Sequence, residues 1–467
     1  MGFDFQLLEN AGIQLIDGDR GKNYPKHNDF MENGYCLFLS AKNVTKSGFQ
    51  FQETAFINEI KDSQLRAGKL SYGDIILTTR GTVGNVAYYD SSNPYKNIRI
   101  NSGMIIIRAD EKLWNPKFLY FILTSGFIQE QIINLISGSA VPQLPARDIK
   151  KFILPVIGRN IQDKIANIIS AFSDKISINI DTNQTLEQMS QTLFKSWFVD
   201  FDPVIDNALD AGNPIPEALQ SRAELRQKVR NSVDFKPLPV DIRALFPAEF
   251  EETELGWVPK GWKISTAGDE LVVKGGSTPS TSNADFWENG TIHWTSPKDL
   301  TGNDSKVLLD TSKKITELGL KKISSGLLPT DTVLMSSRAP IGYLALAKTP
   351  MSINQGYIAI PSSKNLSPEY IIYWLENIMD DIKGMAGGTT FAEISKGAFK
   401  TISLVIPSEN IVDEFTRLAH QHFGKVVSNT EQINALTNLR DTLLPKLISG
   451  ELSLEDLPDL ANQTEPA

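Results

Sequence analysis

The chain repeats itself over about half of its length, and this repeat restricts its fold more than any other feature of the sequence. Short segments recur in the same order, at separations that run from 256 and 258 residues down to 250. The matched segments are residues 40–44 with 296–300, 75–80 with 333–338, Gly84 with Gly342, 101–103 with 354–356, Pro116 with Pro368, and 138–140 with 388–390. This ordered series predicts two diverged copies of one domain. A chain of 467 residues can also bury more than one hydrophobic core.

Each copy ends in a long helical pattern in which apolar residues recur at intervals of three and four. The first set is Ile161, Ile165, Ile168, Ile176, Leu186, Leu193 and Trp197, and the second, each member 250 residues later, is Ile411, Phe415, Leu418, Val426, Leu436, Leu443 and Leu447. This spacing is typical of a coiled-coil seam. Because both seams share one register within a single chain, we expect the two helices to pair with each other, antiparallel.

One seam position differs in polarity between the copies, since Asn183 occupies the place of Ile433. We interpret it as the only polar mismatch in the seam. An Asn at such a position commonly fixes the register at some cost in stability. Ordinary helix packing, or homodimerisation through one seam, is the alternative interpretation of the apolar stripes. The shared register favours pairing within the chain, with the two globular copies at opposite ends of a rod.

These patterns predict an α+β fold with two similar domains separated by a long antiparallel two-helix coiled coil. The expected boundaries are 1–157 and 253–407 for the domains, 158–199 and 408–450 for the helices, 200–252 for a linker and 451–467 for an acidic tail. The linker is acidic and rich in proline, and one short helix is expected in it at residues 217–231.

The net charge of −9 argues at first sight against a nucleic-acid partner. Its distribution weakens that objection, because residues 200–256 contribute −6 and residues 451–467 contribute −5, which leaves +2 on the remainder. The single cysteine, Cys36, excludes an internal disulfide framework. No apolar run approaches the ~18 residues of a membrane-spanning helix. We therefore expect a cytoplasmic protein without a membrane partner.

Residue patterns for catalysis are missing from the sequence. We find no phosphate-binding loop of the G-x-x-x-x-G-K-[ST] type and no Asn/Asp-Pro-Pro-aromatic tetrad of adenine methyltransferases. Four histidines and one cysteine are too few for an ordinary zinc site, and His420 and His422 face different directions on a helix. Glu59-Ile60-Lys61 resembles a fragment of a nuclease motif, but a solvated strand or turn is the better interpretation. We expect neither a metal nor a catalytic residue.

Several segments together carry a resemblance to a known family. They are residues 193–204, LFKSWFVDFDPV, residues 253–259, TELGWVP, residues 275–279, GGSTP, and residues 294–300. With these motifs the chain resembles the specificity subunits of type I restriction–modification enzymes, over nearly its whole length. One departure is visible, because the first copy begins at Ile13 with little sequence before it and lacks a counterpart of Gly256-Trp257. We therefore expect its first strand to be truncated.

The resemblance implies two target-recognition domains held apart by the helix pair, each reading one half of a split, asymmetric DNA sequence. It implies a chain without a catalytic site or cofactor of its own. Two modification subunits would dock on the helices and methylate adenine with S-adenosylmethionine, and restriction subunits that translocate DNA with ATP and Mg²⁺ would join for cleavage. The seam positions offered for this docking are Ile165, Ile176, Leu186, Leu193, Trp197, Phe415, Val426, Leu436 and Leu443.

Contact with DNA would come from basic residues at the ends of strands and in loops. The candidates are Arg20, Lys22, Lys42 and Arg80 in the first copy, and Lys274, Lys298 and Arg338 in the second. Lys42 matches Lys298 and Arg80 matches Arg338, so these pairs are expected to hold phosphates or structure, while base contacts should lie in divergent loops such as 22–33 and 280–289. An arginine beside glycines is about as well suited to tying down a turn.

Three other functions compete with this interpretation. A specificity subunit of a type IIB-like modification system would share the same body plan. A coiled-coil scaffold would bind proteins without DNA, and a self-sufficient enzyme would act alone on DNA with ATP and a methyl donor. Salt-sensitive retention of duplex DNA would distinguish a DNA-specificity subunit from a coiled-coil scaffold.

Overall fold

The computed structural model describes residues 3–138, 142–303, 305–338, 340–387 and 392–452. The chain divides into two compact units. Unit 1 takes in residues up to Ile176 and those from Asn434 onward, and unit 2 takes in Ser177–Ile433. The divisions fall inside the two long helices, so each unit holds one copy of the repeat together with parts of both helices. The repeated segment at 138–140 and 388–390 lies largely outside the described residues, as does most of the acidic tail.

Unit 1 is built on a four-stranded antiparallel sheet, in the order β2-β10-β7-β8, and a three-stranded sheet, in the order β6-β3-β9. The strands are β2 (Ile13–Asp17), β10 (Met104–Ala109), β7 (Ile75–Thr78), β8 (Val86–Tyr88), β6 (Phe56–Ile57), β3 (Cys36–Leu39) and β9 (Ile98–Ile100). Ile75 and Leu77 pack into one hydrophobic cluster with α2 (Pro116–Thr124), while Ile76 packs into another with β3 and β9. Both faces of β7 are therefore buried, which explains why its residues Ile75, Ile76 and Leu77 are all apolar.

Unit 2 repeats this plan, with sheets in the orders β15-β22-β19-β20-β17 and β18-β16-β21. The strands are β15 (Leu271–Lys274), β22 (Tyr357–Ser363), β19 (Val333–Ser336), β20 (Leu344–Ala347), β17 (Val307–Leu308), β18 (Lys313–Ile315), β16 (Ile292–Thr295) and β21 (Met351–Ile353). Even the single parallel pair of the smaller sheet recurs, as β3 with β9 and as β16 with β21. The α+β repeat predicted from the sequence is confirmed.

A short strand closes each copy at its start. In unit 1, β1 (Phe5–Leu7) pairs with β11 (Ile153–Pro155), and in unit 2, β14 (Lys263–Thr266) pairs with β23 (Ser403–Ile406). The first strand of copy one is therefore present, with three residues against four in its counterpart β14, so the expected truncation is slight. The Gly256-Trp257 segment belongs instead to a separate hairpin of β12 (Phe250–Thr253) and β13 (Gly256–Pro259), which precedes the repeated strand.

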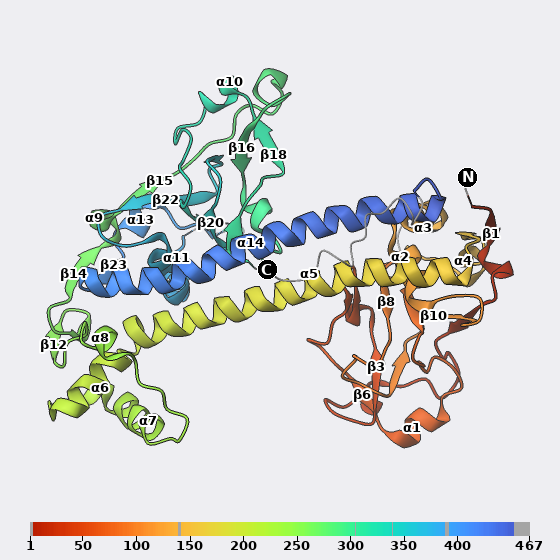
Figure 1. Ribbon diagram of the computed structural model, residues 1–467, viewed down its shortest axis with the longest axis horizontal. Coiled ribbons are helices and arrows are strands. Elements are labelled where there is room, and N and C mark those ends of the chain that lie inside the picture. Colours follow the sequence, from red (N-terminus) through yellow and green to blue (C-terminus); the bar gives the residue numbers. More distant parts are fainter. Residues whose placement is uncertain (1–2, 139–141, 304, 339, 388–391, 453–467) are drawn as a thin grey trace. The chain divides into compact units, whose positions relative to one another are not determined.

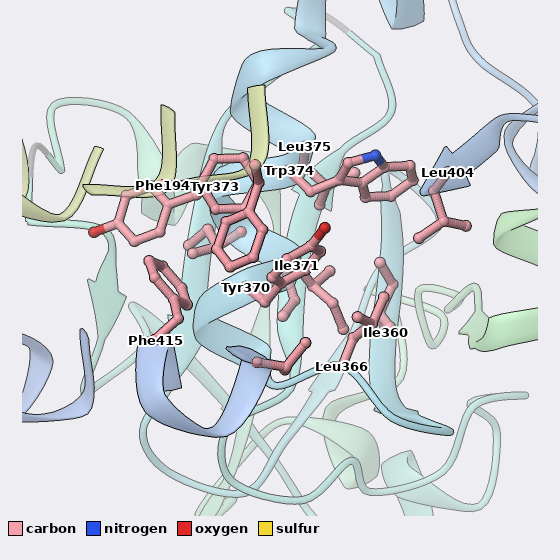
Figure 2. Close-up of a cluster of buried hydrophobic side chains, with 14 of the residues drawn as sticks. Phe194, Ile360, Leu366, Tyr370, Ile371, Tyr373, Trp374, Leu375, Leu404 and Phe415 are labelled. Atoms are coloured by element: carbon pink, nitrogen blue, oxygen red, sulfur yellow. The ribbon is translucent and has the colours of Figure 1, made fainter. Parts of the chain in front are cut away.

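The core of unit 2 joins its sheet to both long helices through aromatic residues of α11 (Pro368–Asn377). Figure 2 shows Tyr370 and Tyr373 of this helix in one cluster with Phe194 and Phe415, which come from the two long helices. The ring centroids of Phe194 and Tyr370 are 5.1 Å apart, in an edge-to-face arrangement. Edge-to-face pairs of this kind add to the burial energy. The aromatic residues of α11 thus join the sheet of unit 2 to the long helices.

The long helices are α5 (Arg159–Phe194), continued by a five-residue π-helix (Lys195–Val199), and α14 (Glu409–Ser449). Within unit 2 they run antiparallel, because Asn183 bonds Asn429 at 2.8 Å and Ser190, seven residues later, bonds His422, seven residues earlier, at 2.7 Å. Within unit 1, Ile165 and the residues around it share a core cluster with Leu444 and Leu447. The predicted antiparallel coiled coil is confirmed.

The predicted seam residues are at least partly buried. Ile165, Trp197, Phe415 and Val426 are buried, and Ile176, Leu186, Leu193, Leu436 and Leu443 are partly buried. The seam also buries Asn179 and Asn429, which occupy equivalent positions of the two copies and are therefore no mismatch between them. The Asn179 amide donates to Gln432 Oε1 at 2.7 Å. Polar residues at seam spacing were overlooked because the pattern was built from apolar residues alone.

Replacing Asn183 with Ile, the residue at the equivalent position of the second copy, should destabilise unit 2. Asn429 is 2% exposed, and the substitution removes the acceptor of its amide. A buried polar group without a partner costs about 1–3 kcal/mol. Thermal unfolding followed by circular dichroism should show a lower midpoint for Asn183→Ile and a midpoint nearer wild type for the double substitution Asn183→Ile/Asn429→Leu. A single variant as stable as wild type, with exposed Gln184→Ala as the control, would contradict this role.

The predicted linker at residues 200–252 is instead a folded helical region. It contains α6 (Asp202–Ala211), α7 (Gln220–Arg230) and α8 (Val240–Arg243), and α6 and α7 pack against each other (Figure 1). The expected short helix at 217–231 is confirmed by α7 and the turn before it.

Ion pairs between α6 and α7 explain why this region folds. Asp202 pairs with Arg222 at 2.7 Å and Asp206 with Arg226 at 2.8 Å, while Asp210 pairs with Arg230. The aspartates recur every four residues, as do the arginines, so each series lies on one face of its helix. Each arginine stands 20 residues after its aspartate, which is why local charge suggested a solvated linker.

Candidate nucleic-acid interface

A tight turn of the same construction follows the last strand of the small sheet in each copy. In unit 1 it is residues 101–103, where Asn101 Oδ1 accepts a hydrogen bond from the Gly103 amide at 2.9 Å. In unit 2 it is residues 354–356, where Asn354 Oδ1 accepts from the Gly356 amide at 2.8 Å. The middle residue of each turn is fixed in place by its neighbours, and it differs between the copies.

The two matched arginines lie beside these turns. The amide of Thr79, just before Arg80, donates to Gly103 O at 2.8 Å, and the amide of Ser337, just before Arg338, donates to Gly356 O at the same distance. Each arginine follows a buried strand, β7 or β19, and begins a loop that a threonine or serine hydroxyl closes. The shared backbone bonds hold both arginines in equivalent places.

The arginines differ in the residue opposite them. Arg80 forms a backbone bridge with Gln143, and Arg338 forms the equivalent bridge with Glu393. The guanidinium of Arg338 lies 3.7 Å from the Glu393 carboxylate, and its side chain is 36% exposed. Arg80 is exposed and faces an uncharged glutamine. Its charge is therefore the more available of the two.

The matched lysines lie in two further turns that have the same form. Lys42 and Lys298 each sit in a short 3-10 helix that begins at a serine and is closed by a reciprocal capping box. Both lysines are exposed, and Lys42 pairs with Glu53 at 2.6 Å. In unit 1 the Asn85 amide links this region to the arginine loop through Val44 O, at 2.9 Å. In each copy the matched lysine follows a strand of the smaller sheet and the matched arginine a strand of the larger one. In unit 1 the Asn85 bond brings these two turns together.

Two polar residues meet over the middle of the repeated turn, and they are different in the two copies. In unit 1, Arg20 Nη2 donates to Ser102 O at 3.4 Å and to Asp17 Oδ1 at 3.2 Å. In unit 2, Thr278 Oγ1 donates to Gln355 Oε1 at 2.7 Å. Thr278 stands 258 residues after Arg20, the separation found for the neighbouring strands.

Glycine permits this meeting in both copies. A Cβ on Gly18 would lie 2.2 Å from Asn101 O, and one on Gly276 would lie 1.8 Å from Ile353 O. Only glycine allows the loop to cross the strand end so closely. Arg20 and Thr278 follow these crossings by two residues, so the chain delivers them to the same place.

The remaining predicted residues lie in less constrained positions. Lys22 is exposed and borders a hollow of about 250 Å³ with Asp19, Gln64 and Arg66. The backbone amides of Arg66 and Gly21 each donate to Asp19 at 2.7 Å and lower the pKa of its carboxyl. Lys274 is exposed at the end of β15. Neither lysine is joined to the arginine loops by a hydrogen bond or ion pair among the described residues.

Sequence reasoning missed Gln355 and Thr278. It placed base contacts in the long divergent loops 22–33 and 280–289, and it treated residues 101–103 and 354–356 only as a match. The signal lies in the comparison of the two copies. Both have an asparagine and a glycine at the ends of this turn, but the residue between them is serine in the first copy and glutamine in the second. A divergent residue inside a shared frame is a stronger indication of specificity than divergence in a loop of variable length.

Other residues considered for chemistry have structural partners. His420 Nδ1 lies 2.9 Å from Glu369 Oε1, and His422 contacts Ser190 in the helix seam. Glu59 and Lys61 belong to the helix α1 (Glu59–Gln64), not to a strand or turn. In the described ranges, no group of three or more His, Cys, Asp or Glu is placed to hold a metal, and no helix is long and apolar enough to cross a membrane.

Comparison with known proteins gives the same family for both copies of the repeat. The family model described as the type I restriction modification DNA specificity domain matches residues 11–188 and again 259–438. The chain is 27% identical over 456 residues to the type I restriction enzyme HindI specificity subunit of Haemophilus influenzae, covering 93% of this chain and 98% of the relative. It is 26% identical over 412 residues to the MjaIX specificity subunit of Methanocaldococcus jannaschii, covering 85% and 81%.

The fold also has a counterpart among solved structures. The crystal structure of a type I restriction-modification system S subunit from M. genitalium covers 96% of each chain, with a TM-score of 0.55 and 16% sequence identity. At this identity the likeness concerns the fold.

Proposed function

This chain belongs to the type I restriction-modification DNA specificity family, and we propose that it selects the DNA sequence on which a type I restriction–modification complex acts. One observation carries the proposal. Each recognition domain has a matched arginine and an exposed lysine around the same turn, but a different polar residue at its centre. The arginine is exposed in unit 1, and in unit 2 it is partly exposed beside Glu393. Shared basic residues suit phosphates, which are alike in every DNA, and different central residues suit bases, which are not.

Two unlike recognition domains in one chain support recognition of a bipartite, asymmetric site. A symmetric dimer of one reader would require a palindrome instead. Each domain is fastened to the helix pair within its own unit, and in unit 2 Lys306 Nζ bonds both Glu187 of α5 and Glu376 of α11 at 2.5 Å. We propose that the helix pair sets the spacing between the half-sites.

Other subunits would supply the chemistry. We propose two modification subunits that bind S-adenosylmethionine and methylate adenine, and restriction subunits that translocate DNA with ATP and Mg²⁺. Seam residues such as Trp197 and Phe415 are buried within this chain, so partner subunits would contact the outward faces of the helices.

The salt dependence of DNA binding tests this function. In complex with its modification subunits, the chain should bind duplex DNA with an affinity that falls as salt rises. Lys298→Ala should weaken binding to all sequences by a similar factor and reduce the slope of log K against log salt by about 0.9. Lys364 is a matched control, because it is 62% exposed but lies at the other end of β22 from the turn.

Fluorescence anisotropy with a labelled duplex, titrated at several salt concentrations, gives both quantities. Lys364→Ala should leave affinity and slope close to wild type. Absence of DNA binding at every salt concentration would favour the protein scaffold and contradict the proposed function. Equal effects of the two lysine substitutions would contradict the placement of the phosphate contacts.

A further inference from the structure

We propose that the centre of the repeated turn is a base-reading point in each recognition domain: Gln355, held by Thr278, in unit 2, and Arg20, held over Ser102, in unit 1. This inference rests on the proposed function and assigns particular side chains to it. Gln355 is exposed, and the Arg20 side chain is 55% exposed, so both can reach a ligand.

The first step of the argument is the rigidity of the frame. The turn in unit 2 is closed by Asn354 and Gly356, and Gly356 O accepts the amide of Ser337 at 2.8 Å. The Asn354 amide in turn donates to Thr295 O at 3.0 Å, beside the lysine-bearing turn. A side chain at the centre of such a turn is presented in a fixed direction, as discrimination between bases requires.

The second step is the contrast between what is shared and what differs. Arginine and lysine are kept around both turns, whereas the central pair changes from Arg20 and Ser102 to Thr278 and Gln355. If these central residues only stabilised the turn, one pair would serve in both copies, because the surrounding turn is the same. Contacts that carry sequence information are those expected to change between readers of different half-sites.

The third step is the chemistry of the side chains. Thr278 donates to Gln355 Oε1, which fixes the plane of the amide and leaves its NH₂ group and one oxygen lone pair available. That arrangement matches the N7 acceptor and N6 donor of adenine. Asp17 holds the Arg20 guanidinium from one side, and its remaining donors match O6 and N7 of guanine. The geometry therefore points to adenine for Gln355 and guanine for Arg20.

The test is a map of methylated adenines in the genome of cells that express the full chain with its modification subunits. The variants are Gln355→Ala, Gln355→Glu and Arg20→Ala, with Lys364→Ala as the control. Gln355→Ala should relax one base pair of one half-site, with discrimination there reduced on the order of 10- to 100-fold. Arg20→Ala should do the same in the other half-site only.

The variant Gln355→Glu separates base reading from a structural role. A carboxylate accepts from cytosine N4, so the preferred base should change from adenine towards cytosine. Loss of folding could not produce a new preference. Unchanged motifs in all three variants, or relaxation of both half-sites together, would overturn the assignment. A wild-type complex that methylates no defined sequence would contradict the proposed function itself, whereas unchanged motifs in the variants would contradict only the assignment of these residues.

Discussion

Replacing Trp197 with Ala should lower the free energy of unfolding of unit 2 by about 3–5 kcal/mol. Trp197 is 1% exposed and lies in the π-helix that continues α5. Its ring meets Phe246 edge-to-face at 5.0 Å and lies 6.4 Å from Phe415 of α14. The substitution leaves a cavity where the two long helices and the helical region at 200–252 meet.

Urea unfolding followed by circular dichroism measures this loss, and hydrogen exchange of peptides from α11 assigns it to unit 2. Met189→Ala is the matched control, because Met189 is on the same helix but is 51% exposed. It should change stability by less than about 0.5 kcal/mol. Similar midpoints for the two variants would mean that Trp197 does not support the joint between the helices and the domain.

The repeat, the two long helices and the α+β class could be predicted because they depend on patterns that recur. Apolar residues at heptad spacing, such as Phe415 and Val426, report a buried helix face directly. The strands β7 and β19 are predictable for a similar reason, since each is a continuous apolar run before a turn. A second copy of each signal, 250 to 258 residues away, made them stronger than either copy alone.

What the sequence did not reveal depends on contacts between distant residues. Asp206 looks like one charge in an acidic linker until Arg226, 20 residues later, is seen to neutralise it at 2.8 Å. Asn179 looks like a solvent-facing residue until Gln432 is found beside it. Gln355 draws no notice until Thr278 is seen to fix it. Asp206 and Asn179 are buried although their residue types suggest exposure, and in all three cases the partner explains the role of the residue.

Arg99→Ala is expected to destabilise unit 1 by about 3–5 kcal/mol, because it leaves a buried carboxylate with one partner fewer. The Arg99 side chain is 7% exposed and that of Asp62 is 6% exposed, and Nε lies 2.6 Å from Oδ1. The same guanidinium donates to Ala67 O at 2.7 Å. Lys69 also bonds Asp62, at 2.6 Å, but it is 39% exposed and cannot replace the lost donors.

This ion pair should also make unit 1 sensitive to acid. Burial raises the pKa of Asp62, but hydrogen bonds from Lys69 and Arg99 outweigh it and hold the pKa below its ordinary value of 3.8. The pair therefore stabilises the folded state above about pH 4, and this contribution is lost as the pH falls below 3.8. Hydrogen exchange of peptides from β3 and β9, measured from pH 6 down to pH 3 and corrected for the intrinsic rate, should show the protection decreasing in wild type.

Unit 2 contains an alternative to this ion pair at the equivalent positions. Phe38 pairs with Arg99 in the parallel strands of unit 1, and Trp294 pairs with Ser352 in those of unit 2, so Ser352 is the counterpart of Arg99. Leu320, 258 residues after Asp62, is the counterpart of Asp62. Ser352 is fully buried and donates to His293 O at 3.2 Å, and Leu320 packs with Trp294 and Ile315. The second copy thus has uncharged residues at the two positions that form the ion pair in unit 1.

Transfer of this arrangement to unit 1 tests the ion pair against its apolar counterpart. Because replacing a buried ion pair as a whole is often neutral, the double substitution Arg99→Ser/Asp62→Leu should recover most of the stability that Arg99→Ala loses. It should also reduce the dependence of stability on pH below 3.8, since the Asp62 carboxyl no longer titrates, while other carboxyls of unit 1 such as Asp19 still do. Thermal unfolding at pH 7 and pH 3 measures both effects. A double variant no more stable than Arg99→Ala, and just as sensitive to acid, would mean that the site is held together by something other than this pair.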